Sequence, residues 1–446
     1  MRLKLGAARE IITPELGGLF AGYDSPLPST GVYDDLTATV FALEFEETRV
    51  LMVCLTLAMT DKEQTSQLQD ICAKAANVPS DNVIISCTHT HSGPLYFQGD
   101  DPPQYIEKIL KPKLLKASSA AAENMQAVTV GIATTQTMVG INRRELLKDD
   151  EVILGQNPWG AYDPEMTVIS FKCEKGNIIG DIIHCTAHNT ACGIITEVSR
   201  DWAGVMTDRL EAESGGMTVF FNGCAGDISP RTPNGGSTAD LKQAMEIGAL
   251  AGIDAVRAYY DIRDYRSLDL SVVVDEVRIP YAPIMPLESA EELYNELKDS
   301  LVSTFDPEAY ELMMQEHNRR GYASARFHPG MCKLLLEIID LHKKGETGPA
   351  DFVHPQTLVR MGPVVFVPIP FEPSVEISLR LRAYSKFGHT LAMGFCNGYN
   401  SYLVTQDQLC RGGYEVERFR WHSARQLPDN TDTLLINENL RIMEKL

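Results

Sequence analysis

Short apolar runs alternate with amphipathic stretches along most of the chain. Runs rich in β-branched residues predict strands, at residues 37–45, 50–57, 82–87, 128–133, 166–173, 178–185, 217–221, 356–368 and 390–395. Apolar positions that recur every three or four residues predict helices, at residues 61–76, 103–124, 202–214, 240–260 and 373–384. This alternation predicts an α/β fold with a mixed β-sheet core and flanking helices.

The pattern changes between residues 281 and 350, where charged helical sequence replaces the strands. Predicted strands lie on both sides of this region. We therefore expect residues 1–446 to form a single domain that carries a helical insertion at about 281–350.

The net charge argues against nucleic acid as a partner, and the hydropathy argues against a transmembrane segment. The chain has 446 residues, with 40 basic and 60 acidic side chains and a formal net charge of -20. Such a charge repels phosphate backbones, so nucleic acid is not an expected partner. No apolar run approaches the ~18 residues needed to span a bilayer, so we expect no transmembrane segment. The oligomeric state is left open, and a homo-oligomer is compatible with the sequence.

The N-terminus and the cysteines bear on the cellular compartment. The first residues lack the apolar stretch of about 7 to 15 residues that marks a secretory signal. Ten cysteines without such a signal favour reduced thiols in the cytoplasm, although a periplasmic protein whose leader has been removed would begin in the same way. Cys185 and Cys192 flank a histidine and could bind a metal, but small core residues are the simpler interpretation.

The sharpest motif is SCTHTHSGP at residues 86–94, which follows a β-branched run. In an extended backbone alternate side chains share a face, so His89 and His91 point the same way at the end of a strand. Sites of α/β proteins lie at such strand ends. The pair could bind a metal, and it could equally be a hydrogen-bonded pair or two core histidines.

A second pair of histidines lies in DIIHCTAHNTACG, where a strand delivers His184 and His188 into a loop of small residues. A catalytic zinc site uses three or four nitrogen and oxygen ligands from separate elements and leaves a position open for water. His188 is the better candidate for a ligand, although it could also only cap its loop.

The third motif, NGCAGDISP at residues 222–230, contains Asp227 and Ser229. Its glycines allow close backbone approach, which suits a loop that lines a pocket. Ser229 could be a nucleophile, but the sequence contains no G-x-S-x-G elbow. A P-loop, a G-x-G-x-x-G fingerprint and an H-E-x-x-H helix are also absent, which argues against nucleotide enzymes and helix-based zinc proteases.

Two C-terminal segments are rich in groups that can bind a metal or a substrate. PIPFEPSVE contains Glu372 after an apolar strand, and GFCNGYNSYLVTQDQLCRGGYE contains Tyr399, Tyr402 and Tyr414. An isolated glutamate is more often a surface residue, and tyrosines are more often packing residues than ligands. Residue types alone therefore assign these side chains no role.

Taken in order, these motifs resemble the neutral, non-lysosomal ceramidase family. The similarity rests on TPELGGLFAGY, SCTHTHSGP, GINRRE, TAHNTACG followed by SRDWAG, GDISP, PFEP, and NGYNSYLVT followed by GGYE. It spans almost the whole chain. The resemblance implies the fold of the catalytic domain of that family.

The resemblance also implies a set of metal ligands. It makes His89, His188, Glu372 and Tyr402 the ligands of one Zn²⁺ ion. His91 is then not a ligand. Zinc would activate water for hydrolysis, and His91 and Glu372 are both chemically able to accept the proton of that water.

Further roles follow from the same resemblance. His91, Arg143 and Tyr414 would face the substrate carbonyl and stabilise the tetrahedral oxyanion, a role worth ~3 kcal/mol for each donor. Asp227 and Ser229 of the GDISP loop are assigned to substrate binding.

Departures from the family pattern affect the expected substrate. Members of the family carry an additional C-terminal immunoglobulin-like domain, which we do not expect here. Phe371 precedes Glu372 where glycine is usual. We therefore expect a zinc-dependent hydrolase that cleaves an amide or ester bond of a small-molecule or lipid-like acyl substrate. The alternatives are a carbohydrate esterase or lactonase on the same zinc site, or a catalytically silent binding protein of the same fold.

Overall fold

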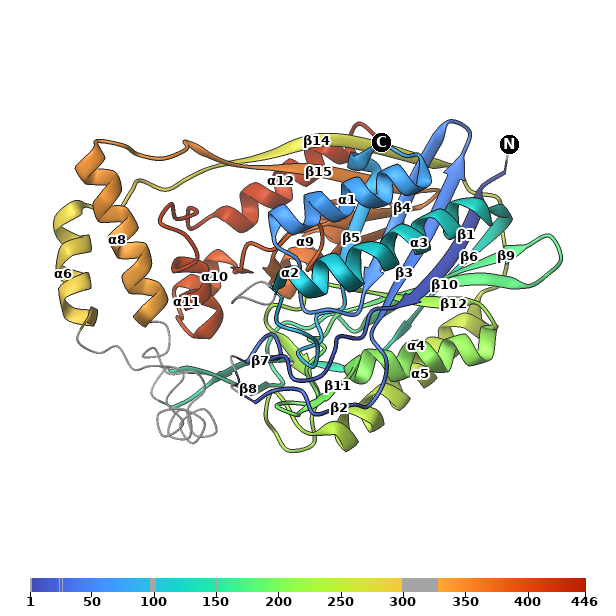
Figure 1. The fold of residues 1–446 in the computed structure, drawn as a ribbon, viewed down its shortest axis with the longest axis horizontal. Helices are drawn as coiled ribbons and strands as arrows, with labels where there is room; N and C mark the ends of the chain where they lie inside the picture. The colour runs from blue at the N-terminus through green and yellow to red at the C-terminus, as the bar shows by residue number, and fades with distance from the viewer. Residues whose placement is uncertain (1, 24, 26, 97–101, 149–150, 299–327) are drawn as a thin grey trace.

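The computed structural model describes residues 2–446 except 24, 26, 97–101, 149–150 and 299–327. Its largest sheet contains, in spatial order, β12 (Met217–Asn222), β10 (Ile178–Cys185), β9 (Glu165–Cys173), β6 (Gln126–Gln136), β1 (Lys4–Ile11), β3 (Thr37–Phe45), β4 (Thr48–Leu55) and β5 (Val83–Cys87) (Figure 1). Strand pairs are antiparallel in the middle of the sheet and parallel at both edges. The predicted α/β class with a mixed sheet is therefore confirmed.

Helices cover one face of this sheet, namely α1 (Lys62–Ala76), α3 (Lys111–Glu123), α4 (Asp201–Ser214) and α5 (Leu241–Asp261). Within β3, Ala38, Val40 and Ala42 belong to the apolar cluster under these helices, whereas Phe41 and Leu43 point to the other face. Because both faces of the strand are covered, most of its residues are apolar, and only Thr37, Thr39 and Glu44 interrupt the run.

A second sheet packs on that other face and consists of β14 (Leu270–Pro280), β15 (Asp351–Met361), β16 (Val364–Pro368) and β18 (His389–Met393). Phe366 of this sheet shares a buried cluster with Phe41 and Phe221 of the first. Its outer face is covered by α9 (Val375–Tyr384) and α12 (Thr431–Met443). The layers therefore run from helices through two sheets to helices.

Shorter elements complete the described chain. Small sheets pair β13 (Ile228–Pro230) with β7 (Gly140–Leu146) and β8 (Val152–Asn157), β17 (Glu372–Pro373) with β19 (Tyr402–Leu403), and β11 (Glu197–Val198) with β2 (Gly31–Val32). Five short helical segments are a 3-10 turn (Ser80–Asn82), α2 (Pro102–Tyr105), a π-helical turn (Ile106–Leu110), α10 (Gln406–Leu409) and α11 (Tyr414–Arg420).

The boundaries of the elements differ from the sequence prediction in instructive places. The first helix begins one residue late because Asp61 is its N-cap and accepts a hydrogen bond from the Gln64 backbone. The single strand predicted at 356–368 is two strands, β15 and β16, with a turn at Gly362, whose φ is 53°. Strand β14 was not predicted, because its charged residues interrupt the apolar pattern.

The described residues of the region where a helical insertion was expected contain two helices. They are α6 (Leu287–Leu297) and α8 (His328–Lys344), and their apolar sides share one cluster with Ala424. Residues 299–327 of the expected insertion lie outside the described residues. Within the described part of the chain, no helix combines the length and hydropathy that crossing a membrane requires.

Asp181 in β10 gives the first prediction, which concerns stability. Its carboxyl is fully buried, hydrogen-bonds to the Ser214 hydroxyl through Oδ2, and leaves Oδ1 without a partner among the described residues. Burial raises the pKa of Asp181 to about 6. In the unfolded chain the pKa returns to ~3.9, so folding stability is lost as the pH rises from about 4 through 6. The total loss amounts to about 3 kcal/mol.

An Asp181→Asn variant should therefore show a shallower fall in stability between pH 4 and pH 7. Thermal unfolding at several pH values measures this slope. Part of the slope should remain, because burial also raises the pKa of Asp227 to about 6. If the stability of parent and variant fell by the same amount between pH 4 and pH 7, the Asp181 carboxyl would not be the cause of the pH dependence.

Candidate metal centre

Three loops bring His89, His188 and Glu372 together. His89 follows β5, His188 follows β10, and Glu372 opens β17. His89 has a positive φ of 68°, which is strained for a residue with a side chain. Its backbone N–H donates to Leu57 O at 2.9 Å, and its ring stacks on Phe395 at 3.9 Å between centroids. These contacts hold the strained residue in place.

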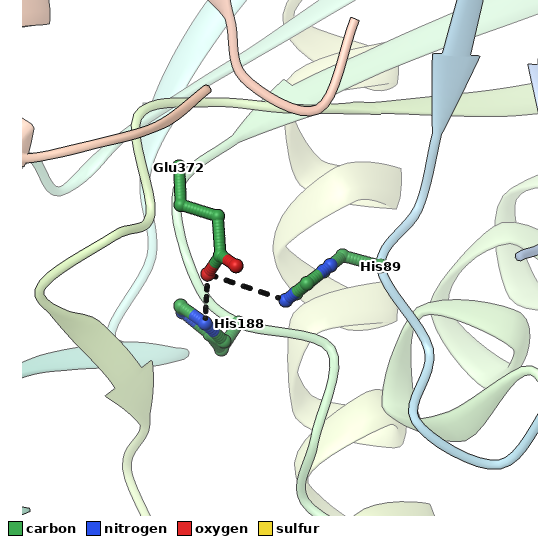
Figure 2. Close-up of side chains that lie close together, drawn as sticks. All are labelled: His89, His188 and Glu372. Atoms are coloured by element: carbon green, nitrogen blue, oxygen red, sulfur yellow. Dashed lines mark hydrogen bonds and ion pairs between the residues drawn. The ribbon is translucent and has the colours of Figure 1, made fainter. Parts of the chain in front are cut away.

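The functional atoms of the three side chains converge on one small space (Figure 2). Glu372 Oε2 lies 3.0 Å from His188 Nε2 and 3.4 Å from His89 Nε2. One possible ligand atom from each residue lies within 4.8 Å of the others, and the side chains are 1 to 3% exposed. This buried group of two imidazoles and a carboxylate is compatible with a metal site.

Backbone carbonyls select the tautomer of both histidines. His89 Nδ1 lies 2.8 Å from Ala58 O, and His188 Nδ1 faces Ala225 O and Ile228 O. Because a carbonyl only accepts, each Nδ1 must carry the proton. Each Nε2 then presents a lone pair to the shared space, as a metal ligand must. Burial, and next the charge of Arg143, lower the pKa of His188 to about 4, so its imidazole is neutral at pH 7.

Tyr402 borders the same space. It lies opposite Glu372 in the β17–β19 pair, and its hydroxyl is 3.5 Å from His188 Nε2. Arg143 on β7 donates to the Tyr402 hydroxyl at 3.0 Å and to His188 Nε2 at 3.1 Å. Burial raises the pKa of Tyr402 well above its usual value, so the phenol is neutral in this arrangement. The four side chains assigned to zinc from the sequence are thus neighbours.

Of the other residues assigned to the site, His91, Tyr414 and Ser229 line a pocket beside the candidate ligands, whereas Asp227 does not. His91 Nε2 lies 3.2 Å from His89 Nε2, and the Tyr414 ring lies 5.4 Å from that of Tyr402. Ser229 lies in the same pocket, which is lined by Gly22, Tyr23, His91, Arg143, Leu154, His188, Thr190, Ser229, Ser237, Thr238, Tyr402 and Tyr414. Asp227 is fully buried and does not line this pocket.

The carboxylate of Asp227 makes internal hydrogen bonds. Its oxygens accept hydrogen bonds from the Val375 N–H and Gln408 Nε2, each at 2.8 Å, and from Asn142 Nδ2 at 3.3 Å. These bonds connect the GDISP loop to β7, α9 and α10. The substrate-binding role expected for Asp227 therefore has less geometric support than the same role for Ser229.

His91 depends on Gly22 for its position. The φ of Gly22 is 98°, and a Cβ added there would lie 2.2 Å from His91 Nδ1. Only glycine combines that backbone angle with such close contact. Burial first, and then the neighbouring His89 and His188, lower the pKa of His91 well below its ordinary value. His91 is therefore neutral at pH 7.

Two neighbours of the site, Glu415 and Tyr399, were assigned no role from the sequence. Glu415 is 1% exposed and accepts bonds from Arg143 Nε at 2.7 Å and from Arg144 Nη1 at 2.6 Å. The Tyr399 hydroxyl donates to Glu372 Oε1 at 2.9 Å. Both residues lie in segments that the sequence analysis had noted, GGYE and NGYNSY. The spacing of residues does not show which side chain of such a segment contacts a ligand residue.

The remaining candidates lie in the core. His184 Nε2 donates to Ala392 O at 3.0 Å and is absent from the candidate metal group. Cys185 and Cys192 are buried free thiols within one apolar cluster. The interpretation of both cysteines as core residues agrees with this position.

Comparisons with known proteins concern the fold. No protein-family model and no curated protein matches the sequence. The crystal structure of neutral ceramidase from Pseudomonas aeruginosa aligns with a TM-score of 0.71 and 20% identity, over 100% of this chain and 75% of that one. A ceramidase complexed with C2 aligns with a TM-score of 0.70 and 19% identity, over 100% and 76%. The chain thus has a neutral-ceramidase-like fold, as its motifs predicted.

Proposed function

We propose that this protein is a zinc-dependent hydrolase of acyl amides or esters. The observation that carries the proposal is the convergence of His89 Nε2, His188 Nε2 and Glu372 Oε2, with both imidazoles oriented by backbone carbonyls. Two imidazoles and a carboxylate form the ligand chemistry of catalytic zinc sites, with Tyr402 as the fourth protein ligand. The ceramidase activity named for the structural neighbours belongs to the same reaction class, because ceramide is an acyl amide.

A zinc ion bound there would polarise a substrate carbonyl and make a nearby water more acidic. Arg143 and Tyr414 lie beside the same space and would donate to the oxygen of that carbonyl as it gains charge. Arg143 is held ready for this role by its bond to Glu415, since a guanidinium fixed in advance needs no reorganisation during the reaction.

We propose that His91 Nε2 accepts the proton of the attacking water. Glu372 is the weaker candidate, because Tyr399 occupies its Oε1 and its Oε2 faces both histidines. In the reaction the oxygen of water bonds to the acyl carbon, and the carbon–nitrogen or carbon–oxygen bond breaks. The proton passes from His91 to the leaving nitrogen or oxygen.

Metal analysis together with activity tests the proposal. We expect about one zinc per chain and hydrolysis of acyl amides or esters that a chelator abolishes and added zinc restores. The analysis should use protein purified without an affinity tag that binds metal. Protein without zinc whose hydrolysis is insensitive to the chelator would refute the proposal.

A further inference from the structure

A second cavity lies beside β7 and is separate from the pocket at the candidate metal centre. It measures about 650 Å³, within the range of small-molecule pockets, ~300–1,000 Å³. The two pockets share no lining residue, and on β7 Arg143 lines the first whereas Arg144 lines the second. We call the second, which is bounded among others by Arg144, Glu145, Trp159 and Glu376, the polar cavity.

Most hydrogen-bond donors of the polar cavity are already bonded within the protein. The side-chain amides of Asn142, Gln156, Asn157 and Gln408 donate to Ala161 O, Thr232 O, Arg144 O and Asp227 Oδ2, at 2.8 to 3.0 Å. The guanidinium groups are paired as well, Arg144 with Glu415 at 2.6 Å and Arg411 with Asp407 at 3.1 Å. The lining therefore offers few free donors to a ligand.

Two carboxylates of the lining, in contrast, have no counter-charge. Glu145 accepts the Gln156 N–H at 3.1 Å through Oε2, and no described residue donates to its Oε1. Glu376, in the first turn of α9, forms neither a hydrogen bond nor an ion pair with a described residue. Both side chains are partly buried. A carboxylate in such a place gains from a positively charged donor, so the free capacity of the cavity is for a cationic ligand.

Trp159 supplies an independent observation. It follows β8, lines the polar cavity and is 94% exposed, the largest fraction among the exposed large hydrophobic side chains of the described chain. The face of an indole attracts organic cations more strongly than that of any other aromatic side chain. No described lysine or arginine lies over the Trp159 ring. The ring is therefore free to contact an ammonium group of a ligand.

A bare metal ion and an anion fit the polar cavity less well. Among the described residues, the one group of three or more carboxylate, imidazole or thiolate ligands close enough to hold a metal is the group of His89, His188 and Glu372. The carboxylates of the cavity are thus not gathered around one point. The formal charge of -20 attracts cations and repels anions. A ligand with several positive charges along its length can reach carboxylates that lie apart.

We propose that the polar cavity binds a small organic polycation, of the chemical class of linear polyamines. One ammonium group donates to Glu145 and another to Glu376, and the chain between or beyond them packs on Trp159. The site shares no residue with the candidate metal ligands, so the proposal does not depend on the hydrolase function.

Calorimetric titration of the full chain with spermidine tests the proposal, at an ionic strength of about 0.15 M to screen diffuse attraction. We expect saturable binding of one spermidine per chain. The neutral comparison compound 1,7-heptanediol, which has a similar length and no charge, should not bind. Protein treated with a chelator should bind spermidine equally well, because the cavity contains none of the candidate metal ligands.

Variants locate the binding. Glu145→Gln and Glu376→Gln should each raise the Kd for spermidine by at least about tenfold, since each removes a charge-assisted hydrogen bond. Trp159→Ala should raise it about twofold to fivefold, and its high exposure makes a folding defect no alternative explanation. Glu197→Gln is the control. Glu197 is also partly buried and has no ion pair with a described residue, but it lies in β11 outside the cavity.

The control variant should bind spermidine with the Kd of the parent. Binding that does not saturate, or that all four variants retain at the parent affinity, would show diffuse attraction to an acidic protein and overturn the proposal. Saturable binding of heptanediol with an affinity equal to that of spermidine would overturn the assigned ligand class.

Discussion

Replacing His188 with glutamine is expected to remove zinc from the protein and to lower kcat/KM for acyl hydrolysis by about 10³-fold. His188 Nε2 lies 3.0 Å from Glu372 Oε2 and faces the shared space, so its loss takes away a central ligand atom. The side-chain amide of glutamine can still donate a hydrogen bond to the carbonyls of Ala225 and Ile228, but it is not a usual zinc ligand. Elemental analysis and steady-state kinetics measure the two effects.

His184→Gln is the matched control. His184 lies on β10, four residues earlier, and hydrogen-bonds Ala392 O away from the candidate metal group. Both variants remove one buried imidazole, but the control should keep its zinc and most of its activity. A His188→Gln protein that retains zinc and turns over substrate at the parent rate would contradict the ligand assignment.

Much of the fold could be predicted because local pattern and tertiary environment agree. In the first sheet, β4 is apolar on both faces from Val50 to Leu55, since helices cover one face and the second sheet covers the other. A continuous apolar run is then a reliable sign of a strand. Strand β14 was not predicted, because charged residues interrupt its apolar pattern. These residues are Asp275, Glu276 and Arg278, and pairing with β15 holds the strand in place.

The candidate site was less accessible to sequence reasoning. The spacing of His89 and His91 indicated a shared face, but only the resemblance joined them to Glu372 and Tyr402. The reason is physical, because Glu372 and Tyr402 meet through the short β17–β19 pair, which has no periodic signature of its own. The same holds for Asp227. Its motif marked a loop correctly, whereas its partners on α9 and α10 are distant in sequence.

Glu415 illustrates what only the structure reveals about this site. Burial alone would raise its pKa, yet Arg143 and Arg144 hold that pKa below the ordinary value. Glu415 is thus a buried carboxylate that binds two buried guanidinium groups, one of which reaches Tyr402 and His188. Without Glu415, Arg143 would lose the bond that fixes its direction. Glu415 is therefore a positioning residue for the proposed reaction.

Glu415→Gln should lower kcat by about 10²-fold while zinc content stays at the parent level, because the variant removes the orientation of an oxyanion donor and no metal ligand. Stability should fall as well, by about 3–5 kcal/mol, since two buried arginines lose their counter-charge. Glu417→Gln in the same helix is the control, because Glu417 forms no ion pair with either arginine. Parent kcat in a destabilised Glu415→Gln protein would reduce Glu415 to a purely structural role. If the variant also lost zinc, the loss of activity would have to be attributed to the metal ligands and not to the orientation of Arg143.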